Sequence, residues 1–172
     1  MRPGRIDGGI PPMDQRFWDQ LARVDRLLKI VGSTDQLSKL GSALNFEDAL
    51  TFACQSMWHL KDWILNDPEF RPKDIAKLKA DIHERRCLLI CADLANGSKH
   101  LTLTRPKIGA SLADQRGICF YPSEGLFQTY YYVACDDPTD RYHGIEIRDL
   151  LIEARSAWEE IIDAHYLTAV DI

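Results

Sequence analysis

The segment Cys87–Ala95 constrains the fold more than any other part of the chain. Its sequence, CLLICADLA, is apolar at every position except Asp93. Such a run avoids water, and its place within a longer helical pattern, about 82–102, predicts a core helix rather than a strand. Asn96, Gly97, Ser98, Lys99 and His100 follow before the chain turns apolar again. The sequence thus predicts a core helix and raises the question of why it carries Asp93, Asn96 and His100 along one line.

The totals describe an ordinary globular protein. With 172 residues, 45% apolar and 27% charged, the chain fits one domain with a sizeable core. The formal net charge of -5 argues against non-specific coating of nucleic acid, which depends on neutralised phosphates. No segment is apolar enough to span a membrane, and the first residues do not resemble a signal peptide. We therefore expect a cytoplasmic protein that does not bind membranes, with its five cysteines reduced.

The pattern along the chain predicts a flexible tail over 1–12 and a single domain over 13–172. Helical spacing of apolar residues indicates helices near 13–31, 45–66, 71–80, 82–102 and 146–167. Gly32 is a stop signal and Asn45 a cap. Asp81 and Glu84 have capping-box spacing for a new helix, with one kinked helix over 71–102 as the alternative. Aromatic and β-favouring residues predict a β-hairpin at about 116–135. The expected fold is mainly α: a bundle of about four to five helices with one β-hairpin inserted before the C-terminal helix.

Polar residues interrupt two of these helices. Asp93, Asn96 and His100 have the spacing i, i+3, i+7 and share one face of the core helix. His59 and Asp62, three residues apart, share a face of the preceding long helix. We expect the helices 45–66 and 82–102 to pack side by side, so that His59 or Asp62 comes within reach of Asp93 or His100.

Such a cluster has three interpretations. It can be structural, since buried polar networks often fix how helices pack. A metal site is the second, because these groups include nitrogen and oxygen ligands. However, the Glu-x-x-His pairs of helical iron sites are absent, and Cys87 and Cys91, one turn apart, have no second pair to complete a zinc site. We therefore expect no metal and no cofactor.

The third interpretation is RNA chemistry, and it comes from a resemblance. LANGSKH, residues 94–100, resembles the motif helix of the HEPN families, small helical bundles found in bacterial toxins, antiphage systems and RNA-processing enzymes. Their motif has an arginine, then a polar residue, then a histidine after four to six residues. Asn96 matches the polar position and His100 the histidine, whereas Ala95 replaces the arginine. The resemblance implies a metal-independent endoribonuclease or RNA-binding protein, usually a homodimer, with partners such as RNA or an antitoxin.

The chemistry of this motif assigns a role to each candidate residue. His100 would move the proton, with Asn96 and Asp93 as further catalytic candidates. Without the motif arginine, a cation must come from another position, and the candidates are Lys99, Arg86 and Arg105. Together with His59 and Asp62, these cations are the residues that we expect to contact RNA. A non-catalytic helical interaction protein with a structural polar cluster is the alternative function, and a metal-dependent helical-bundle enzyme is the third.

Overall fold

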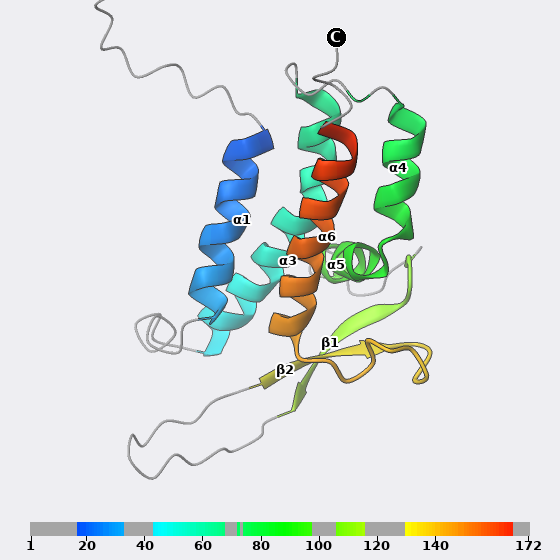
Figure 1. Cartoon of the computed structure of the whole chain (residues 1–172). Coiled ribbons are helices and arrows are strands. Elements are labelled where there is room, and N and C mark those ends of the chain that lie inside the picture. The colour runs from blue at the N-terminus through cyan, green and yellow to red at the C-terminus, as the bar shows by residue number, and fades with distance from the viewer. Residues whose placement is uncertain are drawn as a thin grey trace, which may run out of the picture.

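The computed structural model describes residues 17–32, 43–67, 72, 74–97, 106–115 and 130–166. Within these ranges the chain is mainly α, with a two-stranded antiparallel hairpin before the last helix, as predicted (Figure 1). The elements follow one another as α1 (Phe17–Gly32), α3 (Ala43–Asn66), α4 (Ile75–Glu84), α5 (Arg86–Gly97), β1 (Ala110–Gln115), β2 (Tyr130–Cys135) and α6 (Ile147–Tyr166). The predicted tail over 1–12 lies outside the described residues.

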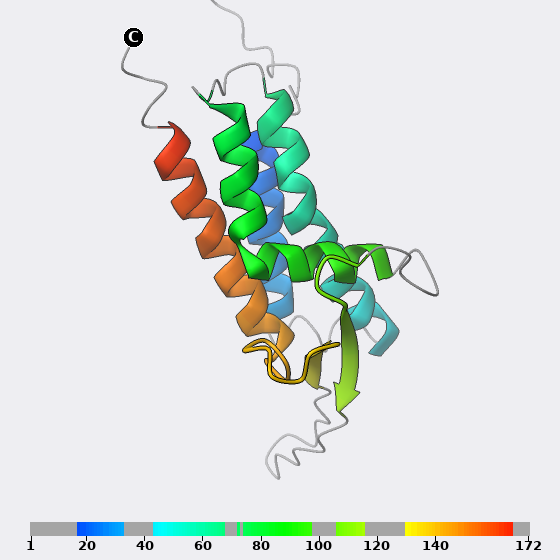
Figure 2. The ribbon, with the colours of Figure 1, turned by 90° about the vertical axis from the view of Figure 1, so that its right-hand side faces the viewer.

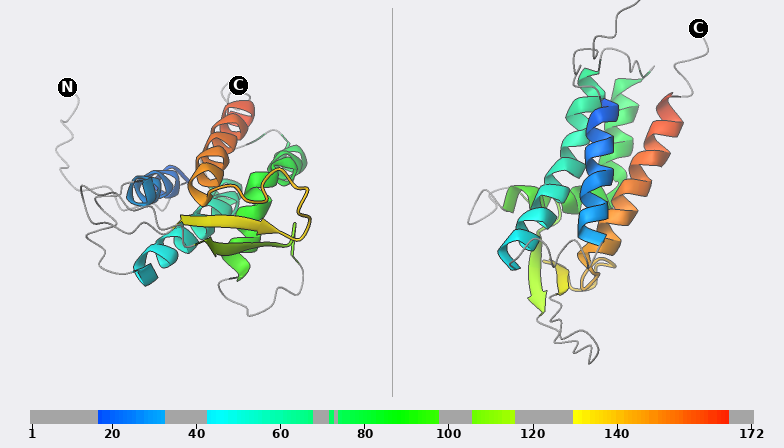
Figure 3. Two further views of the ribbon diagram at one scale, coloured as in Figure 1. Left: turned by 90° about the horizontal axis from the view of Figure 1, so that it is seen from below. Right: turned by 90° about the vertical axis from the view of Figure 1, so that its left-hand side faces the viewer.

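In the described ranges, four helices form an elongated bundle and α5 crosses it. α1, α3, α4 and α6 run along a common direction, whereas α5 lies across them near one end (Figure 2). The hairpin closes the bundle beyond α5, at the end opposite the C-terminus of α6 (Figures 1 and 3). α5 packs against α3, α4, α6 and β1, so it contacts nearly every layer of the fold.

The position of α5 explains its composition. Every residue from Cys87 to Ala95 is buried except Leu89, which is half-buried, because neighbours cover this helix on several sides. α6 adds Trp158, which is fully buried and donates from Nε1 to the carbonyl oxygen of Met57 on α3 at 3.0 Å.

Of the helices in the described ranges, none has the length and apolar character that crossing a membrane requires.

Several predicted boundaries are confirmed and others are wrong. α1 ends at Gly32, as predicted, but α3 begins at Ala43, so Asn45 lies inside the helix rather than capping it. The predicted capping box at Asp81 also fails, because α4 continues through it to Glu84. The capping residue is Asp74, whose carboxylate accepts from the backbone N–H of Lys77 at 2.8 Å.

The hairpin begins earlier in the chain than predicted. β1 comes before residue 116, and its register pairs Ala110 with Cys135 and Gln115 with Tyr130. On the other side of β2, the N–H of Val133 donates to the carbonyl oxygen of Ile145 at 3.0 Å, which ties the approach to α6 into the sheet. Residues 116–129, the centre of the predicted hairpin, lie outside the described residues.

Candidate functional site

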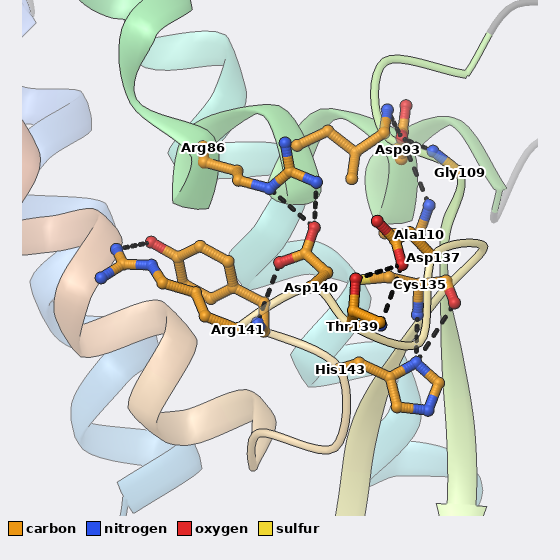
Figure 4. A network of polar contacts seen from close by, with 12 residues as sticks. Arg86, Asp93, Gly109, Ala110, Cys135, Asp137, Thr139, Asp140, Arg141 and His143 are labelled. Carbon is orange, nitrogen blue, oxygen red and sulfur yellow. Dashed lines mark hydrogen bonds and ion pairs between the residues drawn. The ribbon is translucent and has the colours of Figure 1, made fainter.

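Asp93 is buried, and its carboxylate is occupied by the backbone leading into β1. It is 1% exposed. Oδ1 accepts from the N–H of Lys107 at 2.6 Å, and Oδ2 accepts from the N–H groups of Ile108, Gly109 and Ala110 at 2.6, 2.8 and 3.3 Å. Figure 4 shows this carboxylate against the start of the strand. Successive amides that converge in this way form a concave anion-binding site, which the protein fills with its own side chain.

This arrangement has a clear structural role. Because α5 is fixed in the core, the buried Asp93 carboxylate is a fixed acceptor for the segment 107–110, which leads into β1. Gly109 has φ +74°, a left-handed conformation that favours glycine, and it lets the chain bend around the carboxylate. Hydrogen bonds to a charged acceptor are stronger than neutral ones. Asp93 therefore anchors the start of β1 to the bundle, and both of its oxygens are used for this.

The two predicted members of the cluster on α3, His59 and Asp62, do not join Asp93. The predicted contact between α3 and α5 is present, although α5 crosses α3 rather than running beside it (Figure 2). However, the His59 and Asp62 side chains are 49% and 52% exposed, with Nδ1 3.9 Å from Oδ2, and Lys61 donates to Asp62 at 2.8 Å. Within the described ranges, neither forms a hydrogen bond or ion pair with Asp93. The apolar side of α3 faces the core, and these two residues lie off it.

Asn96 lies near the point where α5 leaves the core. It is exposed although Asp93, one turn earlier, is buried. Asn96 and Asp93 therefore have different surroundings despite their common helix face. The motif histidine, His100, and the candidate cations Lys99 and Arg105 lie outside the described residues. The remaining candidate cation, Arg86, begins α5 and is already paired with a carboxylate.

The partner of Arg86 is Asp140, in a turn between β2 and α6. Nε of Arg86 donates to Oδ2 of Asp140 at 2.7 Å, and Nη2 contacts the same oxygen (Figure 4). The Asp140 side chain is 1% exposed. The hydrogen bond from Arg86 holds the pKa of Asp140 below its ordinary value. This pair fixes the turn to the first residue of α5.

A second contact joins the same turn to α6. The hydroxyl of Tyr142 donates to Oε1 of Glu153 at 2.5 Å, and Arg141 contacts both groups. Tyr142 is buried, and burial raises its pKa. The turn is thus fixed at both ends by charged or buried partners. The sequence offered no signal for this beyond the density of polar residues in DDPTDRYHG.

The described cysteines are buried free thiols: Cys54, Cys87, Cys91 and Cys135. The hydrogen bond with Cys54 and its own burial raise the pKa of Cys91, which makes it a poor nucleophile and a poor metal ligand. In the part of the chain that the structure describes, no three His, Cys, Asp or Glu side chains are grouped so that they could hold a metal ion.

Comparison with known proteins gives no further assignment. No family model, no curated protein and no solved structure matches the chain.

Proposed function

We propose that this chain is a non-catalytic helical interaction protein whose polar cluster is structural. The observation that carries this proposal is the Asp93 carboxylate, enclosed at 1% exposure and engaged by four backbone N–H groups. A catalytic carboxylate must reach a substrate, whereas the Asp93 carboxylate is closed off from solvent and both of its oxygens already accept hydrogen bonds from the backbone. His59 and Asp62 lie elsewhere on the surface, so the described members of the cluster do not form one site.

The surface charges favour protein contacts over phosphate binding. Four arginines in the described ranges are paired with carboxylates, which offsets the charge that would attract a phosphate chain: Arg85 with Glu160, Arg86 with Asp140, Arg141 with Glu153, and Arg155 with Asp25. Meanwhile, large apolar side chains are 45–60% exposed on four different helices: Trp18, Phe52, Ile75 and Ile152. Single exposed apolar residues are common, but aromatic ones are enriched at protein interfaces.

Surface variants test this proposal in the organism's own cells. We expect Phe52→Ser or Ile152→Ser to fold normally, because both side chains are exposed, and to lose at least one protein that co-purifies with the parent. Lys29→Ser, an exposed polar position on α1, is the matched control and should retain it. If no co-purifying protein depends on either apolar residue, these positions do not form the interface.

The exposure of Asn96 supports a second candidate function. Asn96 is open to solvent near the end of α5, where the resemblance to the HEPN families places a polar motif residue. In this alternative, a cytoplasmic homodimer of a toxin or phage-defence system binds RNA, or cleaves it without metal, through Asn96 and His100. An antitoxin would be its protein partner.

Two alanine variants test this alternative. In this alternative, Asn96→Ala and His100→Ala should both weaken RNA binding or cleavage. Asn96→Ala should keep the melting temperature of the parent, since its exposed side chain adds little stability. A parent with no affinity for RNA would end this alternative.

A further inference from the structure

We infer that Asn96 and Gly97 form a site of spontaneous covalent modification, at which Asn96 is converted to aspartate and isoaspartate. This pair ends α5, and both residues are exposed. Asparagine is among the chemically labile residues. The inference is independent of the proposed function, because it requires neither RNA nor a partner.

The reaction needs only the chain itself and water. The backbone nitrogen of Gly97 attacks the side-chain carbonyl carbon of Asn96, closing a five-membered succinimide and releasing ammonia. Water then opens the ring at either carbonyl, which gives aspartate or isoaspartate. In total, one water is consumed and one ammonia is released, with no oxidation or reduction.

The end of a helix is a suitable place for this attack. Inside a helix, the backbone is held away from the geometry that brings this nitrogen to the side chain, whereas the last residues of a helix fray. Asp93, one turn earlier, is fixed by its four hydrogen bonds, but Asn96 lies beyond that anchor. The absence of a side chain on Gly97 leaves the attacking nitrogen unhindered.

The described fold does not require a glycine at 97. The described glycines with positive φ are Gly109 and Gly144, and Gly97 is not among them. A Cβ added at Gly97 would have no neighbour within 4 Å. Gly97→Ala should therefore fold like the parent and favour the helix end, while it hinders the attack. It separates the chemistry of the pair from the stability of the fold.

A second asparagine in the structure is an internal reference. Asn66 is also exposed at the end of a helix, but its Nδ2 donates to the backbone carbonyl of Asp62 at 2.6 Å. The residue that follows is Asp67, which is buried and accepts from the N–H of Phe17 at 2.9 Å. Asn66 therefore has a held side chain and is followed by a buried residue that carries a side chain, unlike Gly97, so it should remain unmodified.

Mass spectrometry of the aged protein tests this inference. After incubation of the full chain in mildly alkaline buffer, we expect the Asn96 peptide to gain one mass unit and to separate into two isomers on chromatography. Gly97→Ala should slow this conversion at least several-fold, and the Asn66 peptide should stay unchanged. Conversion of Asn96 no faster than that of Asn66, or an equal rate in Gly97→Ala, would overturn the inference.

Discussion

Replacing Asp93 tests the anchor between α5 and β1. Asp93→Asn keeps the shape but can place its one oxygen at only one of the two acceptor positions. If that oxygen replaces Oδ2, the new NH2 group faces the N–H of Lys107, whose bond at 2.6 Å is lost. The three remaining bonds lose the charge on their acceptor. Since a hydrogen bond to a charged group contributes about 1.5–3 kcal/mol, we expect a loss of about 2–3 kcal/mol.

Asp93→Ala should cost more, because it leaves all four amides without their acceptor. Lys107 is an exposed residue, whereas Ala110 is only 2% exposed and its N–H has no ready substitute for the carboxylate. We expect a loss of about 4 kcal/mol, near the upper end for single substitutions. In a protein of this size, the Asn variant should melt about 5–10 °C below the parent.

The assays are thermal and urea unfolding followed by circular dichroism, with hydrogen exchange of the 107–110 amides as a local measure. Asp62→Asn is the control, because that carboxylate is half exposed, and it should change the free energy of unfolding by less than about 0.5 kcal/mol. If Asp93→Asn is as stable as Asp62→Asn and its 107–110 amides stay protected, the anchor is not what holds β1 in place.

Three further outcomes follow from the same structure. Arg86 lowers the pKa of Asp140, so the stability from this pair is present above the ordinary carboxylate pKa and is lost as the pH falls through the lowered pKa. Asp140→Asn should therefore reduce the free energy of unfolding by about 2 kcal/mol, measured with urea at neutral pH. The difference from the parent should shrink in acid. Gly109→Ala should reduce the free energy of unfolding by about 1–3 kcal/mol because of the positive φ at this position. It should cost more than Gly144→Ala, because the added Cβ at 109 would also overlap the Asp136 carboxylate, whereas Gly144 has open space around it. Equal melting temperatures for the two variants would contradict this. Elemental analysis of protein purified without a metal-affinity tag should find no stoichiometric transition metal, and about one zinc or iron per chain would refute this.

The sequence predicted the helices well because their signals are local. Apolar residues at helical spacing located α1, α3 and α6 within a few residues, and the dense run in α5 indicated a core helix. β1 was missed, because ASLADQ carries none of the β-branched or aromatic residues that mark strands. Its conformation comes from pairing with β2 and from the anchor at Asp93, and neither is visible in the residues of β1.

The surroundings of Asp93 also depend on distant parts of the chain, which the sequence could not indicate. The sequence identified Asp93 as the residue to explain, since a carboxylate in an apolar helix stands out. It suggested other side chains as partners, whereas the partners are backbone amides from 14 to 17 positions further along the chain. Backbone groups are the same at every position and leave no signal in a sequence. His59 and Asp62 were assigned to the cluster by spacing alone, which does not show which face of α3 meets α5.

The most direct test of the central claim is RNA cleavage, measured side by side for the parent, Asp93→Asn and His100→Ala with their melting temperatures. Single-stranded and structured RNA should be incubated with each protein in the absence of added metal. A structural cluster predicts no cleavage by any of the three and a lower melting temperature for Asp93→Asn. Cleavage by the parent that is lost in His100→Ala, at an unchanged melting temperature, would contradict the account.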